Sequence, residues 1–530
     1  MAVPVQWQCR FALLSLACTA TCAAVAPSEP SALTMAAAAA QDPELGSPHV
    51  SLSRLRTLPS SAPDYFWRCK NGDLNHTGAQ PLTLLPAGGP PAKLTWRWTS
   101  DYPNDVVRAT PLIDSEFNVF IATVTSGRVL KFAPNGTELW RYSSVGAPYD
   151  NAVPPDGFPD VPALMDGSLY VITYDGTVVS LDMASGAERW RVRTGDTALS
   201  CFSVAAGFGV VIVPTVRAGS STGENRLLAF DAHGRKLWQT DLPGASKLAN
   251  LTNPLKALND GAAFNMLVSL VMCPEHGPVA LLADTCGTTY KLALSSGDVL
   301  WRVEGPGSFS TGGAIVGPDD TVYVTTVFGD GASSVTTGDP ESHPLGPVAR
   351  GIVSAYELSG GRLKWRTDLG VGNESNNAPT IGRLDGPGAP LRVVVAAGPN
   401  PFTAQNRELA DGTTGAPLPA RTIALDAATG VVVWVREFPT WHGAAAGDST
   451  AFACRPDSSA NAAIGSDGAV YVPHEDGRLY VMRDADANGE ISEDEVATHD
   501  FGFSFQGAPA LAPGMLAVAP CDGLAVWVAM

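Results

Sequence analysis

The chain has 530 residues, of which 16% are charged, and its formal net charge at pH 7 is −18. Because no basic patch offsets this acidity, the composition argues against nucleic acid as a partner and disfavours docking on anionic lipid. The length allows two or three domains or one large repeat architecture. Short apolar runs broken by Gly, Asp, Asn and Pro favour an all-β fold.

The first 26 residues have the pattern of a secretory signal peptide. Arg10 precedes a short apolar run, FALLSLACTATCAAVA, that ends in small residues. LSLAC is close to a bacterial lipobox, although Ser15 stands where an aliphatic residue is expected. A lipoprotein anchor and an organelle transit peptide are therefore alternatives. We expect a protein of the secretory pathway, secreted or periplasmic if bacterial, with no membrane span because no apolar run is long enough.

Two segments lie between this leader and the first repeat. Residues 27–60 are of low complexity and predict a leader or linker. Residues 61–90 contain YFWRCKNGDLNHTG at 65–78. NGDLNHTG lacks the strand before and the helix after that a phosphate loop needs, so we interpret 61–90 as a packed segment that leads into the repeats.

Six cysteines follow the leader, and an even number in a secreted chain permits three disulfides without fixing their pairing. Buried free thiols are the alternative. The six are Cys69, Cys201, Cys273, Cys286, Cys454 and Cys521.

Six turns share one pattern, in which a glycine is followed by three residues and a tryptophan. Each follows an alternating apolar run and precedes a short polar strand, which predicts strand, tight turn, strand, with glycine supplying the positive φ of the turn. Two further short strands upstream complete a four-stranded propeller blade. We interpret each tryptophan as a structural plate packed on the neighbouring blade. The pairs are Gly136/Trp140, Gly186/Trp190, Gly234/Trp238, Gly297/Trp301, Gly361/Trp365 and Gly430/Trp434.

Counting blades gives eight. A seventh hairpin ends at about Phe501, and the final stretch supplies three more strands. LTWRWT at 94–99 can supply the fourth, so that strands from both termini close the ring and remove its exposed edges. The prediction is an eight-bladed β-propeller of four-stranded blades over residues 91–530, with seven blades as the alternative.

These hairpins resemble the pyrroloquinoline-quinone (PQQ) propeller repeat, Ala-x-Asp-x-x-x-Gly-x-x-x-Trp. Ala424, Asp426, Gly430 and Trp434 match it in full, and the segment 463–482 is also typical. The resemblance implies the quinoprotein alcohol dehydrogenase-like superfamily. This superfamily includes PQQ- and calcium-dependent dehydrogenases of alcohols and sugars. It also includes scaffolds that bind no quinone, among them an outer-membrane assembly lipoprotein.

The chain departs from the quinone enzymes in lacking adjacent cysteines and a Cys-x-x-Cys-His haem site. This favours a non-catalytic propeller that presents a face to a protein or glycan partner, and no catalytic residue is assigned. The alternative is a PQQ- and calcium-dependent dehydrogenase. Amides and a carboxylate would then hold the cofactor at the ring axis under an aromatic ring, with the carboxylate as base. The candidates are Asn376, Asn377, Trp441, His442 and Asp448.

Residues 484–495, DADANGEISEDE, have the spacing of an EF-hand calcium loop, with Gly489 at the sharp bend. The flanks read as strands, so we expect the loop to be an extended turn of the seventh hairpin. Calcium would rigidify that hairpin, whereas a solvated acidic turn is the alternative. The ligands would be the backbone carbonyl of Glu490 and the side chains of Asp484, Asp486, Asn488, Ser492 and Glu495.

Overall fold

The computed structural model describes part of the chain. It covers residues 65–81, 94–144, 161–196, 198, 203–216, 225–242, 267–284, 287–306, 312–328, 350–398, 417–442, 444–448, 454 and 458–529. These residues belong to one compact unit, Val50–Met530. The predicted signal peptide and linker, together with Cys201 and Cys286, lie outside the described residues. In the described part of the chain, no helix combines the length and apolar character needed to cross a membrane.

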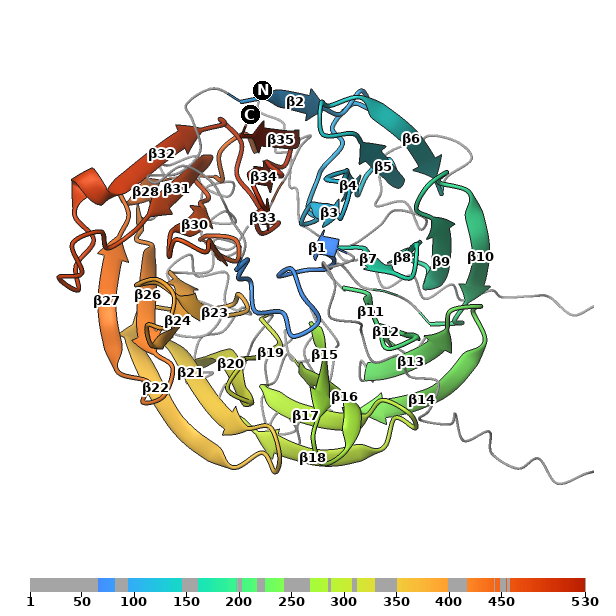
Figure 1. Ribbon diagram of the computed structural model, residues 1–530, viewed down its shortest axis with the longest axis horizontal. Coiled ribbons are helices and arrows are strands. Elements are labelled where there is room, and N and C mark those ends of the chain that lie inside the picture. Colours follow the sequence, from blue (N-terminus) through green and yellow to red (C-terminus); the bar gives the residue numbers. More distant parts are fainter. Residues whose placement is uncertain are drawn as a thin grey trace, which may run out of the picture. The chain divides into compact units, whose positions relative to one another are not determined.

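Eight antiparallel sheets follow one another around a ring, each forming one blade of a β-propeller (Figure 1). The predicted eight-bladed, all-β fold is confirmed. Blade 1 contains β3 (Leu112–Asp114), β4 (Val119–Ala122), β5 (Arg128–Phe132) and β6 (Glu138–Ser143), and blade 2 contains β7 (Ala163–Met165), β8 (Ser168–Ile172), β9 (Thr177–Asp182) and β10 (Glu188–Arg193). Blade 3 contains β11 (Ala205–Gly207), β12 (Val210–Val216), β13 (Asn225–Asp231) and β14 (Lys236–Leu242). Blade 4 contains β15 (Val268–Cys273), β16 (Gly277–Ala283), β17 (Thr288–Ala293) and β18 (Val299–Glu304).

The second half of the ring repeats this order. A small two-stranded sheet, formed by β25 (Pro417–Leu418) and β28 (Trp441–His442), lies outside the blade sheets. Blade 5 contains β19 (Ala314–Val316), β20 (Thr321–Phe328), β21 (Arg350–Glu357) and β22 (Leu363–Val371), and blade 6 contains β23 (Thr380–Arg383), β24 (Leu391–Ala397), β26 (Arg421–Asp426) and β27 (Val432–Glu437). Blade 7 contains β29 (Ala463–Ile464), β30 (Val470–Pro473), β31 (Arg478–Met482) and β32 (Val496–Asp500). Blade 8 contains β33 (Ala510–Ala512), β34 (Met515–Val518), β35 (Gly523–Val528) and β2 (Trp96–Thr99).

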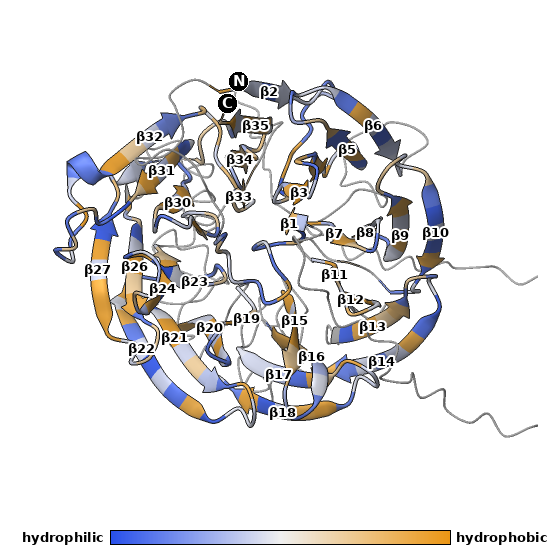
Figure 2. Ribbon diagram, in the orientation of Figure 1, coloured by the Kyte–Doolittle hydropathy of each residue, from blue (hydrophilic) through white to orange (hydrophobic). Residues whose placement is uncertain are grey.

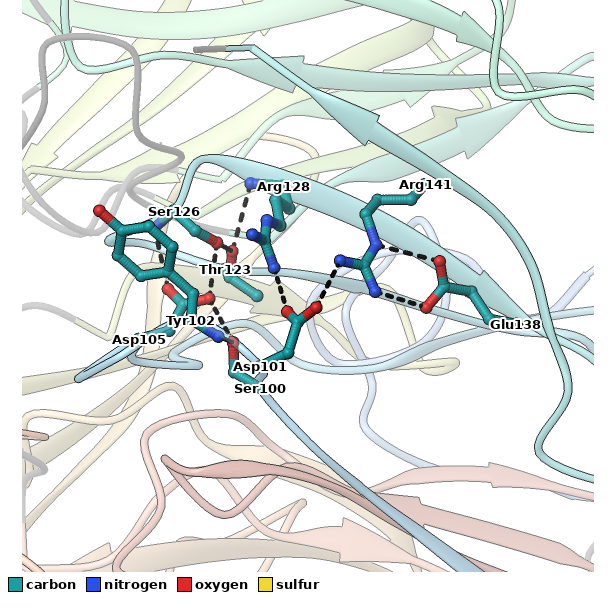
Figure 3. A network of polar contacts seen from close by, with 9 residues as sticks. All are labelled: Ser100, Asp101, Tyr102, Asp105, Thr123, Ser126, Arg128, Glu138 and Arg141. Atoms are coloured by element: carbon teal, nitrogen blue, oxygen red, sulfur yellow. Dashed lines mark hydrogen bonds and ion pairs between the residues drawn. The ribbon is translucent and has the colours of Figure 1, made fainter. Parts of the chain in front are cut away.

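The ring closes through β2, as predicted, because this early strand pairs with β35 near the C-terminus from Trp96↔Val526 to Thr99↔Gly523. The residues after β2 then attach to blade 1 (Figure 3). The Asp105 carboxylate accepts hydrogen bonds from the Ser126 backbone N–H at 2.9 Å and from its hydroxyl at 2.6 Å.

A second carboxylate in the same network binds two arginines of blade 1. Asp101 contacts Arg128 and, at 2.9 Å, Arg141, which also forms a bidentate pair with Glu138 (Figure 3). Hydrogen bonds from Arg141 and Arg128 hold the pKa of Asp101 below its usual range. The polar network therefore fastens the closing strand to the first blade.

The repeated tryptophans pack on the turn of the next blade, which confirms their interpretation as structural plates. A Cβ on Gly430, for example, would lie 2.4 Å from Cε3 of Trp365. The Trp365 indole N–H donates to the Ala427 carbonyl in that turn at 2.9 Å. A β-bulge lies one residue before each of the six tryptophans, and it turns the tryptophan side chain toward the next blade. The shifted registers occur in the hairpins β5–β6, β9–β10, β13–β14, β17–β18, β21–β22 and β26–β27.

One further tryptophan takes part in the same contacts. Trp96, from the closing strand, donates its indole N–H to the Pro134 carbonyl at 2.8 Å and lies against the turn glycine Gly136 of blade 1. Blade 8 therefore contacts blade 1 in the same way as its neighbours contact one another.

The apolar core lies within and between the blades. The inner and middle strands are mostly apolar and buried, whereas the outer strands alternate polar and apolar residues (Figure 2). One disulfide, Cys454–Cys521, adds a covalent tie with a Cα–Cα distance of 5.7 Å and links the segment before β29 to blade 8. Cys69 and Cys273 are buried free thiols, so the six cysteines do not form three disulfides and the alternative of buried free thiols holds for these two.

Candidate functional site

The ring axis is the first place where a propeller can bind a ligand, and here residues 65–80 cross it. This stretch, the axial segment, begins with β1 (Tyr65–Trp67), which pairs with β3 of blade 1. Figure 1 shows it winding through the centre of the ring, inside the inner strands. Trp67, Asn71 and His76 on it are each at most 1% exposed.

The axial segment hydrogen bonds to the inner strand of one blade after another. β1 contacts blade 1, and the following contacts reach blades 2 to 4: Leu164 N–H to Arg68 O at 2.9 Å (blade 2), Arg68 Nη2 to Ala206 O at 3.2 Å (blade 3) and Leu270 N–H to Leu74 O at 2.8 Å (blade 4). Those to blades 5 to 8 are Val316 N–H to Asn75 O at 2.9 Å (blade 5), Ile381 N–H to Thr77 O at 2.8 Å (blade 6), Ile464 N–H to Gly78 O at 2.8 Å (blade 7) and Gln80 Nε2 to Leu511 O at 3.3 Å (blade 8).

These contacts reach all eight blades, so the segment acts as a common inner edge for the sheets. It also satisfies backbone groups that would otherwise face the channel unpaired. Gly78 is required at its position, because its φ is +70° and a Cβ would lie 2.6 Å from Thr380 Cγ2. Burial raises the pKa of Asp73, whose carboxylate accepts hydrogen bonds from the backbone and side chain of Thr77.

The five residues considered for a quinone site fall into two groups. Asn376 is buried, and Asn377 is engaged on both sides, because its side-chain amide donates to Ser459 O and its carbonyl accepts from Thr325 Oγ1 at 2.5 Å. These two residues precede β23 of blade 6. Asn377 thus links its neighbours in blades 5 and 7.

The other group lies in the connection between blades 6 and 7. Trp441 and His442 form β28, and the Trp441 indole donates to Ala444 O at 3.0 Å. Asp448 accepts the Cys454 N–H at 2.7 Å, next to the disulfide. The contacts of both groups are with the protein's own chain, and their role as a cofactor site stays a prediction.

The loop 484–495 lies between β31 and β32, as expected, and strands rather than long helices hold its ends. Its only helical element in the described structure is the 3-10 turn η3 (Glu493–Glu495). Carboxylate oxygens of Asp484, Asp486 and Glu495 lie within 4.8 Å of one another. Two oxygens on opposite sides of a calcium ion are separated by about 5 Å, so this spacing fits the ion.

Backbone N–H groups order the loop around these carboxylates. Asp484 accepts the N–H groups of Asn488 at 3.0 Å and Gly489 at 2.9 Å, and Gly489 has a φ of +83°. Glu495 accepts the N–H groups of Ser492 at 2.9 Å and Ala485 at 2.6 Å. These donors, Ser492 first, hold the pKa of Glu495 below its usual range.

Two further predicted ligands, Ser492 and Asn488, hydrogen bond to carboxylates of this cluster. The Ser492 hydroxyl donates to Glu495 at 2.9 Å, and the Asn488 side chain donates to Asp486 at 2.9 Å while its oxygen accepts the Glu490 N–H at 2.7 Å. The donor set consists of hard oxygens, which is the chemistry that calcium prefers.

The loop also packs on blade 6, which the sequence did not indicate. Ile491 is 7% exposed and belongs to the same apolar cluster as Trp434 of β27. Arg436 donates to the Ile491 carbonyl at 3.0 Å and pairs with Glu493 at 2.8 Å. The loop is therefore part of the interface between blades 6 and 7.

Comparison with known proteins identifies a family over most of the chain. Residues 125–270 and 287–526 match the family of outer membrane protein assembly factor BamB. The factor of Burkholderia pseudomallei is 26% identical over 262 residues, which are 48% of this chain and 54% of that protein. The factor of Nitrosomonas eutropha is 39% identical over 84 residues, 16% of this chain and 18% of that protein. The chain thus matches about half, or less, of the length of these relatives.

Solved structures share the fold at low sequence identity. BamB from Moraxella catarrhalis has a TM-score of 0.51 at 14% identity, covering 82% of this chain and 99% of that one. Quinohemoprotein alcohol dehydrogenase from Comamonas testosteroni has a TM-score of 0.56 at 14% identity, covering 88% and 80%. An assembly factor and an alcohol dehydrogenase therefore share this propeller fold, and the fold alone does not separate the two functions.

Proposed function

Because the chain belongs to the family of outer membrane protein assembly factor BamB, we propose that it is a non-catalytic scaffold of the bacterial cell envelope. It would hold a protein partner, one that takes part in the assembly of outer membrane proteins, on a face of its propeller. A glycan partner is the second possibility for the same surface. The disulfide Cys454–Cys521 supports an envelope location, because such bonds persist in oxidising compartments.

The observation that carries this proposal is the axial segment. A flat cofactor at the ring axis needs open space between the inner strands, and residues 65–80 run through that region with contacts to all eight blades. Displacing the segment would leave inner-strand N–H and C=O groups unpaired, at a cost of about 1–3 kcal/mol for each buried group. A scaffold needs no such displacement.

We also propose that the loop 484–495 binds one calcium ion. The clustered oxygens of Asp484, Asp486 and Glu495 support this, together with the bend at Gly489. The ion would offset the mutual repulsion of the carboxylates and fix Ile491 against Trp434. Calcium would then stabilise the interface between blades 6 and 7 and serve no catalytic step.

A PQQ- and calcium-dependent dehydrogenase is the second candidate, and the shared fold of the Comamonas testosteroni enzyme favours it. Asn376, Asn377 and Asp448 would then hold the quinone, which would accept the electrons of the substrate. Asp448 would remove a proton, and Trp441 would cover the ring. This function requires Asn377 to exchange its contact with Ser459 for the cofactor.

Calorimetric titration of PQQ into the mature, calcium-loaded protein separates the two functions. The scaffold predicts no heat of binding and no shift of visible absorbance. Tight one-to-one binding that is weakened by Asn377→Ala would instead establish the dehydrogenase, and alcohols and sugars would then be tested as substrates.

A further inference from the structure

Two blades have a buried lysine where the repeat has alanine. Lys131 in β5 and Lys291 in β17 each lie opposite the tryptophan of their hairpin, Trp140 and Trp301. Lys291 Nζ donates to the Leu358 carbonyl of blade 5 at 2.9 Å, and the Trp301 indole donates to the same oxygen at 3.1 Å. Lysine thus reinforces the contact between neighbouring blades.

The two lysines differ in what balances their charge. Lys131 Nζ lies 3.5 Å from the Asp114 carboxylate and donates to the Met183 carbonyl at 3.1 Å. Lys291 is 0% exposed, and among the described residues no carboxylate oxygen lies within 4.0 Å of its Nζ. Cys273 Sγ and His276 Nδ1, each 3.2 Å from Lys291 Nζ, take the place that the Asp114 carboxylate has beside Lys131.

This cluster combines three groups that can take part in covalent chemistry: the Cys273 thiol, the His276 imidazole and the Lys291 amine. Cys273 ends β15 and is 1% exposed, while His276 lies in the turn before β16 with 36% of its side chain exposed. Because His276 Nδ1 lies 3.7 Å from Cys273 Sγ, the buried sulfur is one partly exposed side chain away from solvent. The same turn brings the Glu275, His276 and Cys273 ligand atoms within 4.8 Å of one another, but the Lys291 ammonium beside them opposes a metal cation.

We propose that Cys273 and Lys291 form a peroxide-dependent cross-link, a sulfur–nitrogen bond between Sγ and Nζ. Hydrogen peroxide first converts the thiol to sulfenic acid and is reduced to water. His276 Nδ1 takes a proton from the Lys291 ammonium, and the free amine then attacks the sulfenic sulfur. The S–O bond breaks, the S–N bond forms, and a second water leaves. Sulfur is the atom oxidised, and the nitrogen changes only its bonding partner.

The cross-link changes the contact between blades 4 and 5. An ammonium group has three N–H donors, and Lys291 uses them for Leu358 O at 2.9 Å, Ser359 O at 3.3 Å and the Cys273–His276 pair. A sulfenamide nitrogen carries one N–H and no charge, so the two carbonyls of blade 5 lose donors. Oxidation would therefore loosen this interface while it joins β15 to β17.

Peptide mapping of the full chain tests the proposal. The protein is treated with hydrogen peroxide under native conditions, alkylated, digested and analysed by mass spectrometry, with and without dithiothreitol. The expected product joins the Cys273 and Lys291 peptides and is about 2 Da lighter than their sum, the mass of two hydrogens. Dithiothreitol should restore both peptides, and when the protein is denatured before acylation, the Lys291 amine should resist the reagent only in the oxidised sample.

The chain provides its own control. Lys131 has the same register and burial but faces Asp114, so it should give no cross-linked peptide in the same digest. Cys273→Ser removes the sulfur with little change of volume and should abolish the product. Recovery of Cys273 as a free thiol, as a sulfinic acid heavier by about 32 Da, or in a disulfide with another cysteine would each overturn the proposal.

Discussion

The sixth and seventh hairpins solve one packing problem in two ways. In blade 6 the short turn after β26 brings Gly430 under Trp365 of the preceding blade. In blade 7 the turn is a twelve-residue acidic loop, and Ile491 rather than a glycine packs with the preceding tryptophan, Trp434. The atom nearest to a Cβ on Gly489 is a backbone oxygen 3.8 Å away.

The register of the strands reflects the same difference. In the sixth hairpin a bulge separates Ala424↔Trp434 from Leu425↔Val432. In the seventh hairpin the pairing runs without a shift, and Val496 lies opposite Met482. Phe501, where the sequence placed the end of this hairpin, follows β32 and packs edge-on against Phe505 and Trp527. The interface between blades is thus maintained when its usual glycine–tryptophan contact is replaced by a contact from a twelve-residue acidic loop.

The two glycines give the largest expected contrast. Gly430→Ala should destabilise the protein by about 2–5 kcal/mol, because the left-handed backbone costs about 1–2 kcal/mol and the overlap with Trp365 costs about 1–3 kcal/mol. Gly489→Ala should cost only the backbone contribution, about 1–2 kcal/mol. Urea unfolding in calcium-free buffer measures both, and equal losses would contradict the packing difference.

Calcium should act on one hairpin only. At a free calcium concentration 100-fold above the dissociation constant, binding should stabilise the wild type by about 2.7 kcal/mol. Asp484→Ala should remove the bound ion and this increment. Asp426→Ala breaks turn contacts to Thr429 in the sixth hairpin and should lose stability equally with and without calcium. An unchanged calcium stoichiometry and melting temperature in Asp484→Ala would reject the calcium site.

The two tryptophans should differ by one hydrogen bond. The Trp365 N–H donates to the Ala427 carbonyl at 2.9 Å, whereas among the described residues the Trp434 N–H has no acceptor. Trp365→Phe should therefore cost about 1 kcal/mol more than Trp434→Phe, since both changes remove similar apolar area. Chemical denaturation of the pair gives this difference directly, and a larger loss for Trp434→Phe would refute it.

The smallest effect should be a pH dependence of the seventh hairpin. Because its folded-state pKa is lowered from 4.5, the Glu495 carboxylate stabilises the fold above that pH, and its contribution is lost as pH falls through the folded-state value. In calcium-free buffer, the difference in stability between wild type and Glu495→Gln should be present at neutral pH and shrink below about pH 4.5. A difference that does not depend on pH would assign the effect to shape rather than charge.

Much of this architecture could be predicted because the repeat is local. Six glycine–tryptophan spacings, a period-two apolar pattern and an unpaired strand at 94–99 define the blades and the closure of the ring. The predicted calcium loop is equally local, since the twelve residues 484–495 contain all its predicted ligands. Its geometry in the structure agrees with that pattern, and its occupancy by calcium stays a prediction.

What lies far apart in sequence could not be predicted in this way. The choice of Cys521 as the partner of Cys454, 67 residues away, depends on how blades 7 and 8 meet. Asn377 was singled out as a polar residue near the axis, but the structure shows its amide and carbonyl contacting two neighbouring blades. Nothing in the local sequence around Lys291 indicates that its amine lies beside Cys273.

The sequence by itself determined the unit of this protein, a four-stranded blade with a glycine turn, because those preferences act over a few residues. Only the tertiary structure decided what the units do together. Closing the ring places residues 65–80 against all eight inner strands, seats Ile491 against Trp434, and brings a lysine, a cysteine and a histidine within hydrogen-bonding distance. Such contacts depend on the arrangement of whole blades. Burial away from water then strengthens the electrostatic interactions among these few polar groups.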